Sequence, residues 1–332
     1  MILHMLLGIS APAVPDSGRQ WMPENTENIT EGIRQILRSA FGAIHPDLKE
    51  AVAVSLSLVG LMMLVSLIHF LPGAKEKLPD FVAAVVIGTV LLGSTNSLIS
   101  LGMLTIEELS SYGKLLLPVM ASAMAAQGGI TTSTALYAGT ALTNTILTSV
   151  LTKLLRPLVY IFLVLCTANA AMDEELLKKM AGFVKWLCVW ILKIILYVFT
   201  GYMGITGVVS GTTDAATLKA AKLTISGVVP VVGGILSDAS EAVLVSAGVV
   251  KNAAGIYGIL ALLAMFVSPF LKLGCHYLVI RVTGAVCSVF GMKGCTGLIS
   301  DFSTAMGLLM AMTGSVCLLQ LISTVCFLRG VG

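Results

Sequence analysis

The sequence predicts an all-α, polytopic helical membrane protein with six to ten membrane segments. The first observation is composition: 57% of the 332 residues are hydrophobic and 11% are charged, whereas soluble domains carry about a quarter charged residues. The second is a series of apolar runs long enough to cross a bilayer core, which takes about 20 helical residues. The third is a pair of apolar segments interrupted by Pro and Gly.

Six stretches with few or no charged residues predict ordinary spanning helices. Each is strongly apolar and has a length at or near that of one crossing. Buried helices of a very large soluble core are the alternative interpretation, but six such runs in one chain make it the poorer one. The predicted spans are about 51–71, 82–104, 157–172, 186–209, 253–271 and 303–327.

The first 50 residues differ from the rest of the chain. Residues 1–13 form a short apolar leader that ends in a small-x-small pattern but lacks a basic start, so a vestigial signal and a plain terminus both stay open. Residues 14–50 are polar, and the apolar spacing over 29–41 predicts an amphipathic helix lying on the membrane. Residues 51–332 are predicted to form one integral membrane domain.

Charges between the spans predict the orientation. Lys75 and Lys77 lie in the first short loop, which is therefore expected in the cytoplasm. Residues 14–50 are then expected outside the cytoplasm. Glu107 and Glu108 are expected in the next loop, on the same outer side.

Two apolar segments are interrupted in a way that predicts broken helices. Residues 115–151 contain Gln127-Gly128-Gly129, and residues 223–250 contain Pro230 and Gly233-Gly234. Non-helical backbone at membrane depth survives only where protein or a water-filled cavity surrounds it. Both segments are therefore candidates for discontinuous or re-entrant helices, an architecture that often builds a translocation path.

The prolines suggest an internal duplication. Pro118 and Pro157 are 39 positions apart, as are Pro230 and Pro269, and a shift of 112 residues aligns the two pairs. Chance in a biased composition is the alternative explanation. The corresponding units are residues 51–157 and 158–269, followed by C-terminal helices in 270–332.

Asp238 and Glu241 are the most distinctive polar pair in an apolar setting. Their spacing after Gly233-Gly234 is that of a helix capping box, in which each side chain bonds to the other residue's backbone amide. A cation or proton site is the functional alternative, because carboxylates inside membranes are costly and usually functional. Contact with a partner protein is the third possibility.

The remaining polar residues predict membrane borders rather than chemistry. Asp214, Lys219 and Lys222 lie in an amphipathic stretch, and Lys251-Asn252 is expected to anchor a helix end at the interface. Neither a Walker A, GxSxG or HExxH motif nor a His or Cys set with metal-ligand spacing occurs. The sequence therefore predicts no enzyme, no cofactor and no metal, and a net charge of +3 gives no reason to expect nucleic acid.

Residues 211–258 resemble the signature region of the stage III sporulation protein AE family of endospore-forming Firmicutes. The resemblance rests on Pro230-Val-Val-Gly-Gly234, on Ser237-Asp238-Ala239, and on Lys251-Asn252-Ala253. In order of elements it extends from about residue 30 to the end. The leader is shorter than the signal and extracytoplasmic region usual in the family.

The resemblance implies a non-enzymatic, multi-pass subunit of the channel-like, secretion-like complex encoded by the sporulation stage III A operon. This complex lies in the mother-cell membrane around the forespore and supports late forespore development. The implied partners are the lipid bilayer and the other subunits of the complex. The alternative is a self-sufficient secondary transporter with a midplane site at the broken helices.

Overall fold

The computed structural model describes residues 12–23, 28–69, 77–228 and 233–329, and their side chains except at positions 69, 77–78, 204, 206–251 and 329. The described residues form helices and turns, without strands, which confirms the predicted all-α class. In chain order the elements are α2 (Asp16–Arg19), α3 (Ile29–Gly42), α4 (His45–His69), α5 (Lys77–Ala126), α6 (Ile130–Val150), the π-helical turn η1 (Leu151–Leu155), α7 (Arg156–Met172), α8 (Glu175–Val228), α9 (Gly233–Cys287), the 3-10 turn η2 (Ser288–Phe290) and α10 (Lys293–Arg329).

Six of the helical units in the described part of the chain are long and apolar enough to cross a membrane. Each overlaps one of the six predicted spans, so the multi-pass membrane class is confirmed. The units are His45–Ile68, Pro79–Ala126, Ile130–Met172, Glu175–Met203, Asn252–Phe290 and Lys293–Leu328.

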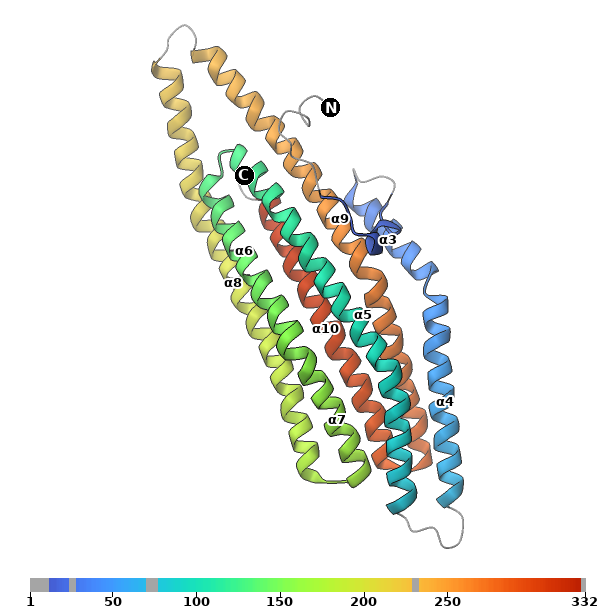
Figure 1. Ribbon diagram of the computed structural model, residues 1–332. Coiled ribbons are helices and arrows are strands. Elements are labelled where there is room, and N and C mark those ends of the chain that lie inside the picture. Colours follow the sequence, from blue (N-terminus) through green and yellow to red (C-terminus); the bar gives the residue numbers. More distant parts are fainter. Residues whose placement is uncertain (1–11, 24–27, 70–76, 229–232, 330–332) are drawn as a thin grey trace.

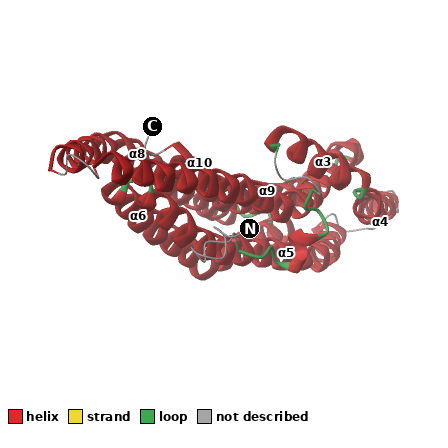
Figure 2. Cartoon of the chain, turned by 90° about the horizontal axis from the view of Figure 1, so that it is seen from above, coloured by secondary structure: helices red, strands yellow, loops and turns green. Residues whose placement is uncertain are grey.

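The long helices alternate in direction and pack side by side into an elongated bundle (Figure 1). We call the end that bears the α7–α8 and α9–α10 turns the basal end, and the end that bears the α5–α6 turn the apical end. Seen from above, α8, α10 and α9 lie in one row and α6 and α5 in a second row (Figure 2).

Helix α10 is the centre of the bundle and α4 is at its edge. α10 contacts α5, α6, α7, α8 and α9, and 61% of its most apolar stretch is buried. α4 packs mainly against α5 and α9, and only 22% of its most apolar stretch is buried. Most of the α4 surface is therefore left for lipid or for another protein.

The prediction of a loop at Glu107 and Glu108 is wrong, because both residues lie inside the continuous helix α5. Pro118 also lies within α5 and does not end it. Glu108 accepts a hydrogen bond from the Ser17 hydroxyl at 2.6 Å, so the N-terminal segment gives one of the two carboxylates a partner. Charge alone suggested a loop, but a helix longer than the bilayer core can carry charges along its length.

The Ser/Thr-rich residues 130–150 continue into the predicted span 157–172. Helices α6 and α7 are joined without a break by η1, in which the backbone widens to π-helical hydrogen bonds. Pro157 lies just after η1, so the π-helical turn lies where proline, which has no backbone N–H, enters the continuous helix. The first interrupted segment, residues 115–151, therefore comprises the end of α5 and the start of a long α6–α7 unit.

Three helices are much longer than one bilayer crossing. α5, α8 and α9 have 50, 54 and 55 residues, or about 75–83 Å at 1.5 Å per residue. A bilayer hydrocarbon core is about 30 Å thick. Large parts of these helices must therefore lie outside one bilayer core.

Helix α3 lies where the apolar spacing over 29–41 predicted an amphipathic helix. Its N-cap Asn28 accepts a hydrogen bond from the Thr30 amide at 3.0 Å, which satisfies one of the free donors of the first turn. Its apolar face packs on protein, because Ile36 and Ala40 are buried against Leu260 and Ala264 of α9. The predicted contact with lipid is thus replaced by a contact with α9.

The elements do not superimpose in the proposed duplication. Under the 112-residue shift, Pro118 inside α5 corresponds to Pro230, which lies between α8 and α9 and outside the described residues. Pro157 at the start of α7 corresponds to Pro269 inside α9. The internal duplication with units 51–157 and 158–269 stays a prediction.

Candidate functional site

Most of the site residues predicted from the sequence have side chains outside the described set. Pro230 lies in 229–232, and the one described side chain of the group, that of Asn252, is exposed. The backbone places Asp214, Lys219 and Lys222 in α8, and Gly233, Gly234, Asp238, Glu241, Lys251 and Asn252 in α9. α9 begins at Gly233 and passes through Asp238 and Glu241, and the capping-box and cation-site interpretations of this pair stay predictions.

Gln127, Gly128 and Gly129 form the turn that joins α5 to α6. Gly128 has a φ of 92°, which glycine adopts without steric cost. The amides of Gly128 and Gly129 donate to the carbonyls of Ala125 and Met124 at 2.9 and 3.2 Å. These bonds satisfy carbonyls at the end of α5, as in a glycine-terminated helix.

A buried polar seam runs between α5, α6 and α10. Asn144 of α6 donates to the Ser110 carbonyl of α5 at 3.2 Å, and the Thr148 hydroxyl donates to the Ser110 hydroxyl at 2.9 Å. Asn144 and Ser110 are buried. We call these residues, together with Tyr112, Thr140 and Gln320, the α5–α6–α10 seam.

Several polar atoms of the seam have no hydrogen-bond partner among the described residues. They are the Tyr112 hydroxyl, the Thr140 hydroxyl, Asn144 Oδ1 and Gln320 Nε2. The Gln320 amide lies directly against Gly113, where a Cβ would collide with it. An unpaired buried polar group costs about 1–3 kcal/mol. A water molecule or a polar ligand group would therefore gain hydrogen bonds at this interface.

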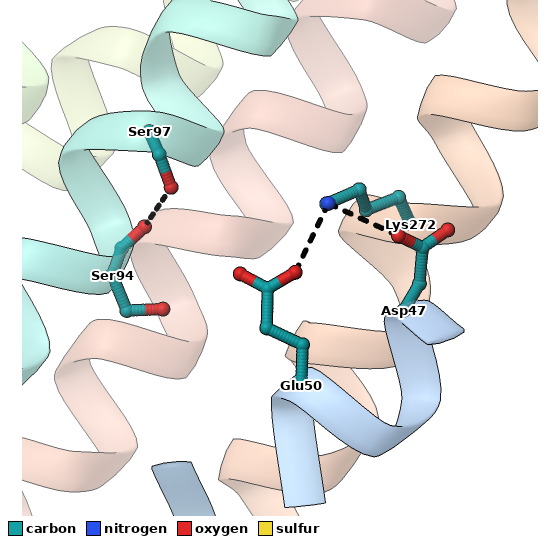
Figure 3. Close-up of polar contacts among 5 residues, drawn as sticks. All are labelled: Asp47, Glu50, Ser94, Ser97 and Lys272. Carbon is teal, nitrogen blue, oxygen red and sulfur yellow. Dashed lines mark hydrogen bonds and ion pairs between the residues drawn. The ribbon is translucent and has the colours of Figure 1, made fainter. Parts of the chain in front are cut away.

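A second polar site joins α4 to α9. Lys272 Nζ lies 3.0 Å from Asp47 Oδ1 and 3.1 Å from Glu50 Oε2 (Figure 3). We call these three residues the ion trio. The side chains of Lys272 and Asp47 are 28% and 25% exposed, so the pair is screened by solvent less than a surface ion pair.

The surface groove between α7 and α8 is almost wholly apolar. It has a volume of about 340 Å³ and is lined by Ile161, Leu165, Lys179, Met180, Phe183 and Val184. Its walls suit a lipid chain better than a polar solute. Among the described residues, no group of three His, Cys, Asp or Glu side chains is placed to hold a metal ion.

Sequence reasoning missed both polar sites. Asp47 and Glu50 directly precede the charge-free run of α4, and Lys272 directly follows that of α9. This pattern marks helix borders, but it does not show that residues 222 positions apart meet. Asn144 and Gln320 are isolated amides in apolar runs, a signal that predicts burial against another helix but not which helix.

Comparisons with known proteins agree on one family. The model of the family described as stage III sporulation protein AE matches residues 19–329. A curated protein named "Stage III sporulation protein AE", from Bacillus subtilis (strain 168), is 20% identical over 222 residues. The match covers 67% of this chain and 56% of that protein. No solved structure matches.

Proposed function

Because the chain belongs to the stage III sporulation protein AE family, we propose that it is a non-enzymatic membrane subunit of the sporulation stage III A channel complex. In this proposal it lies in the mother-cell membrane around the forespore and supports late forespore development. The N-terminal segment 14–50 faces the extracytoplasmic side. The observation that carries the proposal is the family match, which spans nearly the whole described bundle.

Exposed apolar side chains support a role within a larger assembly. Ile130, Leu142, Tyr197 and Val198 are 65%, 65%, 72% and 67% exposed, and they lie on the apical parts of α6 and α8. The three longest helices exceed one bilayer core more than twofold, so lipid of a single bilayer cannot cover their whole length. In a channel complex, neighbouring subunits would cover these exposed apolar side chains where the bilayer does not reach.

The alternative function is that of a self-sufficient secondary transporter. The observation that favours it is the α5–α6–α10 seam, whose unpaired polar atoms are buried in a membrane bundle. Buried polar residues of this kind often line substrate or ion paths. The α7–α8 groove gives it no support, because that groove is apolar.

Tagged full-length chain isolated from sporulating cells tests the proposal. We expect other stage III A subunits to co-purify, and deletion of the gene to stop development after engulfment. The chain reconstituted alone in liposomes should move no solute. Isolation without partners, together with solute flux in liposomes, would support the transporter instead.

Variants of the seam separate the two functions further. Asn144→Leu removes a buried amide, and Thr145→Leu on the exposed side of α6 is its matched control. A transporter that uses the seam would lose flux in Asn144→Leu only. If the chain is a subunit of the complex, neither variant should show flux. Its partners should then co-purify with each variant whose bundle stays folded.

A further inference from the structure

A row of polar side chains lies on the face of α9 that packs against α4. Lys272, His276 and Thr283 are spaced by four and seven residues, which places them on one helix face. The Thr283 and Ser55 hydroxyls are hydrogen bonded across the α4–α9 interface at 2.5 Å. Thr283 and His276 are both buried. The row of polar side chains therefore extends from the ion trio into the interior of the bundle.

The ion trio carries a surplus negative charge. Its two carboxylates face one ammonium at 3.0 and 3.1 Å, so the formal charge of the three groups is −1. Lys272 is 28% exposed and Asp47 is 25% exposed. A surplus charge in a half-buried site attracts a cation more strongly than it would in water.

His276 lies one helical turn below Lys272 and has no exposed surface. Neither of its ring nitrogens has a hydrogen-bond partner among the described residues. A neutral imidazole always has one N–H donor and one free acceptor nitrogen, so this burial leaves both unsatisfied. A buried side chain of this kind is costly unless something binds to it.

The charges that act on the His276 ring are those of Glu50, Lys272 and Asp47. The other helices packed on α9 at this level add none. α5 has no charged residue between Asp80 and Glu107, and α10 has none between Asp301 and Arg329. Among the charged groups, those that act on the ring are therefore the members of the ion trio.

We propose that His276 and the ion trio form a proton-binding site. The neutral imidazole takes one proton from water, an N–H bond forms at the free ring nitrogen, and the charge of the four side chains changes from −1 to 0. The half-exposed carboxylate of Glu50 connects the site to solvent. This inference is independent of the subunit role proposed above.

The chemistry of the four groups favours a proton over a metal cation. An imidazole nitrogen is a poor ligand for the hard cations that carboxylates prefer. Lys272 already occupies the carboxylate oxygens that would otherwise bind such a cation. The free acceptor nitrogen of His276 is a proton acceptor in the range where histidine titrates.

Solid-state NMR of the full chain in liposomes, with ¹⁵N-labelled histidine, tests this site directly. The nitrogen resonances of imidazole and imidazolium differ, and the spectrum of His276→Gln assigns the signal among the four histidines. We expect the His276 signal to change from that of imidazole to that of imidazolium as the pH is lowered. Lys272→Met should move its midpoint upward by about one to two pH units, because a cation next to the ring is removed.

Two further variants keep the test decisive. Asp47→Asn should move the midpoint downward, and Lys272→Arg, which keeps the charge, should leave it in place. A His276 signal that stays neutral over the whole pH range in the native chain and in Lys272→Met would overturn the proposal. Equal midpoints in the native chain and in Asp47→Asn would also overturn the proposal. This comparison does not need Lys272→Met, so the test holds even if that variant does not fold.

Discussion

At the scale of single residues, Gly139 lets α8 approach α6 closely. The Tyr202 ring lies where a Cβ of residue 139 would be, and the Tyr202 hydroxyl donates to the Ala135 carbonyl at 2.9 Å. We expect Gly139→Ala to displace the ring and to destabilise the bundle by roughly 1–3 kcal/mol, the range typical of overpacking. Thermal unfolding in detergent measures the change.

Gly182→Ala is the matched control for this prediction. Gly182 lies in α8 with nothing near the position of an added Cβ. Alanine there should leave stability unchanged or raise it by up to about 1 kcal/mol through helix propensity. Equal melting temperatures for the two variants would show that the Tyr202 contact does not constrain residue 139.

Residue-scale chemistry was only partly predictable. The glycine turn at Gln127-Gly128-Gly129 is a local signal, because positive φ at Gly128 and the end of a helix are encoded within a few residues. The ion trio has no local signal, since Glu50 and Lys272 meet across 222 positions. The orphan nitrogens of His276 likewise depend on how three helices pack around one ring.

At the scale of elements, α3 is held by its apolar face on α9. Ile36 is 1% exposed and packs against Leu260 and Ala264. We expect Ile36→Ala to cost about 2–5 kcal/mol of local stability, because it removes buried methyl groups and leaves a cavity. Faster tryptic cleavage at Arg34 and Arg38 would report the release of α3.

Leu37→Ala is the control for the α3 contact. Leu37 is 40% exposed, so its truncation should change the cleavage rate little. If both variants are cleaved as slowly as the native chain, α3 is retained by contacts other than its apolar face.

Helix continuity was the least predictable property of the elements. Six runs with few or no charged residues identified six membrane units, because burial in lipid excludes charge from long stretches. Glu107 and Glu108 were expected in a loop, yet α5 passes through them. The assumption that a helix ends where charge begins holds only when the helix is as long as the bilayer is thick.

At the scale of the whole molecule, charged side chains on four helices lie at a common height. Arg156 in α7, Lys193 in α8, Lys272 in α9 and Glu50 in α4 are roughly 15–19 residues from the basal ends of their helices, or about 23–29 Å. That height nearly equals the thickness of a bilayer core. We predict that the bilayer covers the basal part of the bundle, up to these residues.

Cysteine accessibility checks this placement. In a chain whose seven native cysteines are replaced by alanine, a membrane-impermeant maleimide added to right-side-out membrane vesicles should label Thr134→Cys in the apical part of α6. Val164→Cys, exposed on the basal part of α7, should stay unlabelled because lipid covers it.

Lys293→Cys at the basal end completes that experiment. It should react only in inverted vesicles if the basal end faces the cytoplasm. Labelling of Val164→Cys together with protection of Thr134→Cys would place the bilayer around the apical half instead.

The ion trio also sets an order of events during synthesis. Glu50 leaves the ribosome 222 residues before Lys272. At a synthesis rate of about 5–20 residues per second, this separation corresponds to about 10–45 seconds. During this interval α4 is already available for insertion, while its two carboxylates lack their counter-ion. A carboxylate without its partner resists entry into a low-dielectric layer. The start of α4 is therefore expected to stay at the water interface until α9 arrives, so the first membrane-spanning helix to be synthesised is among the last to reach its final position.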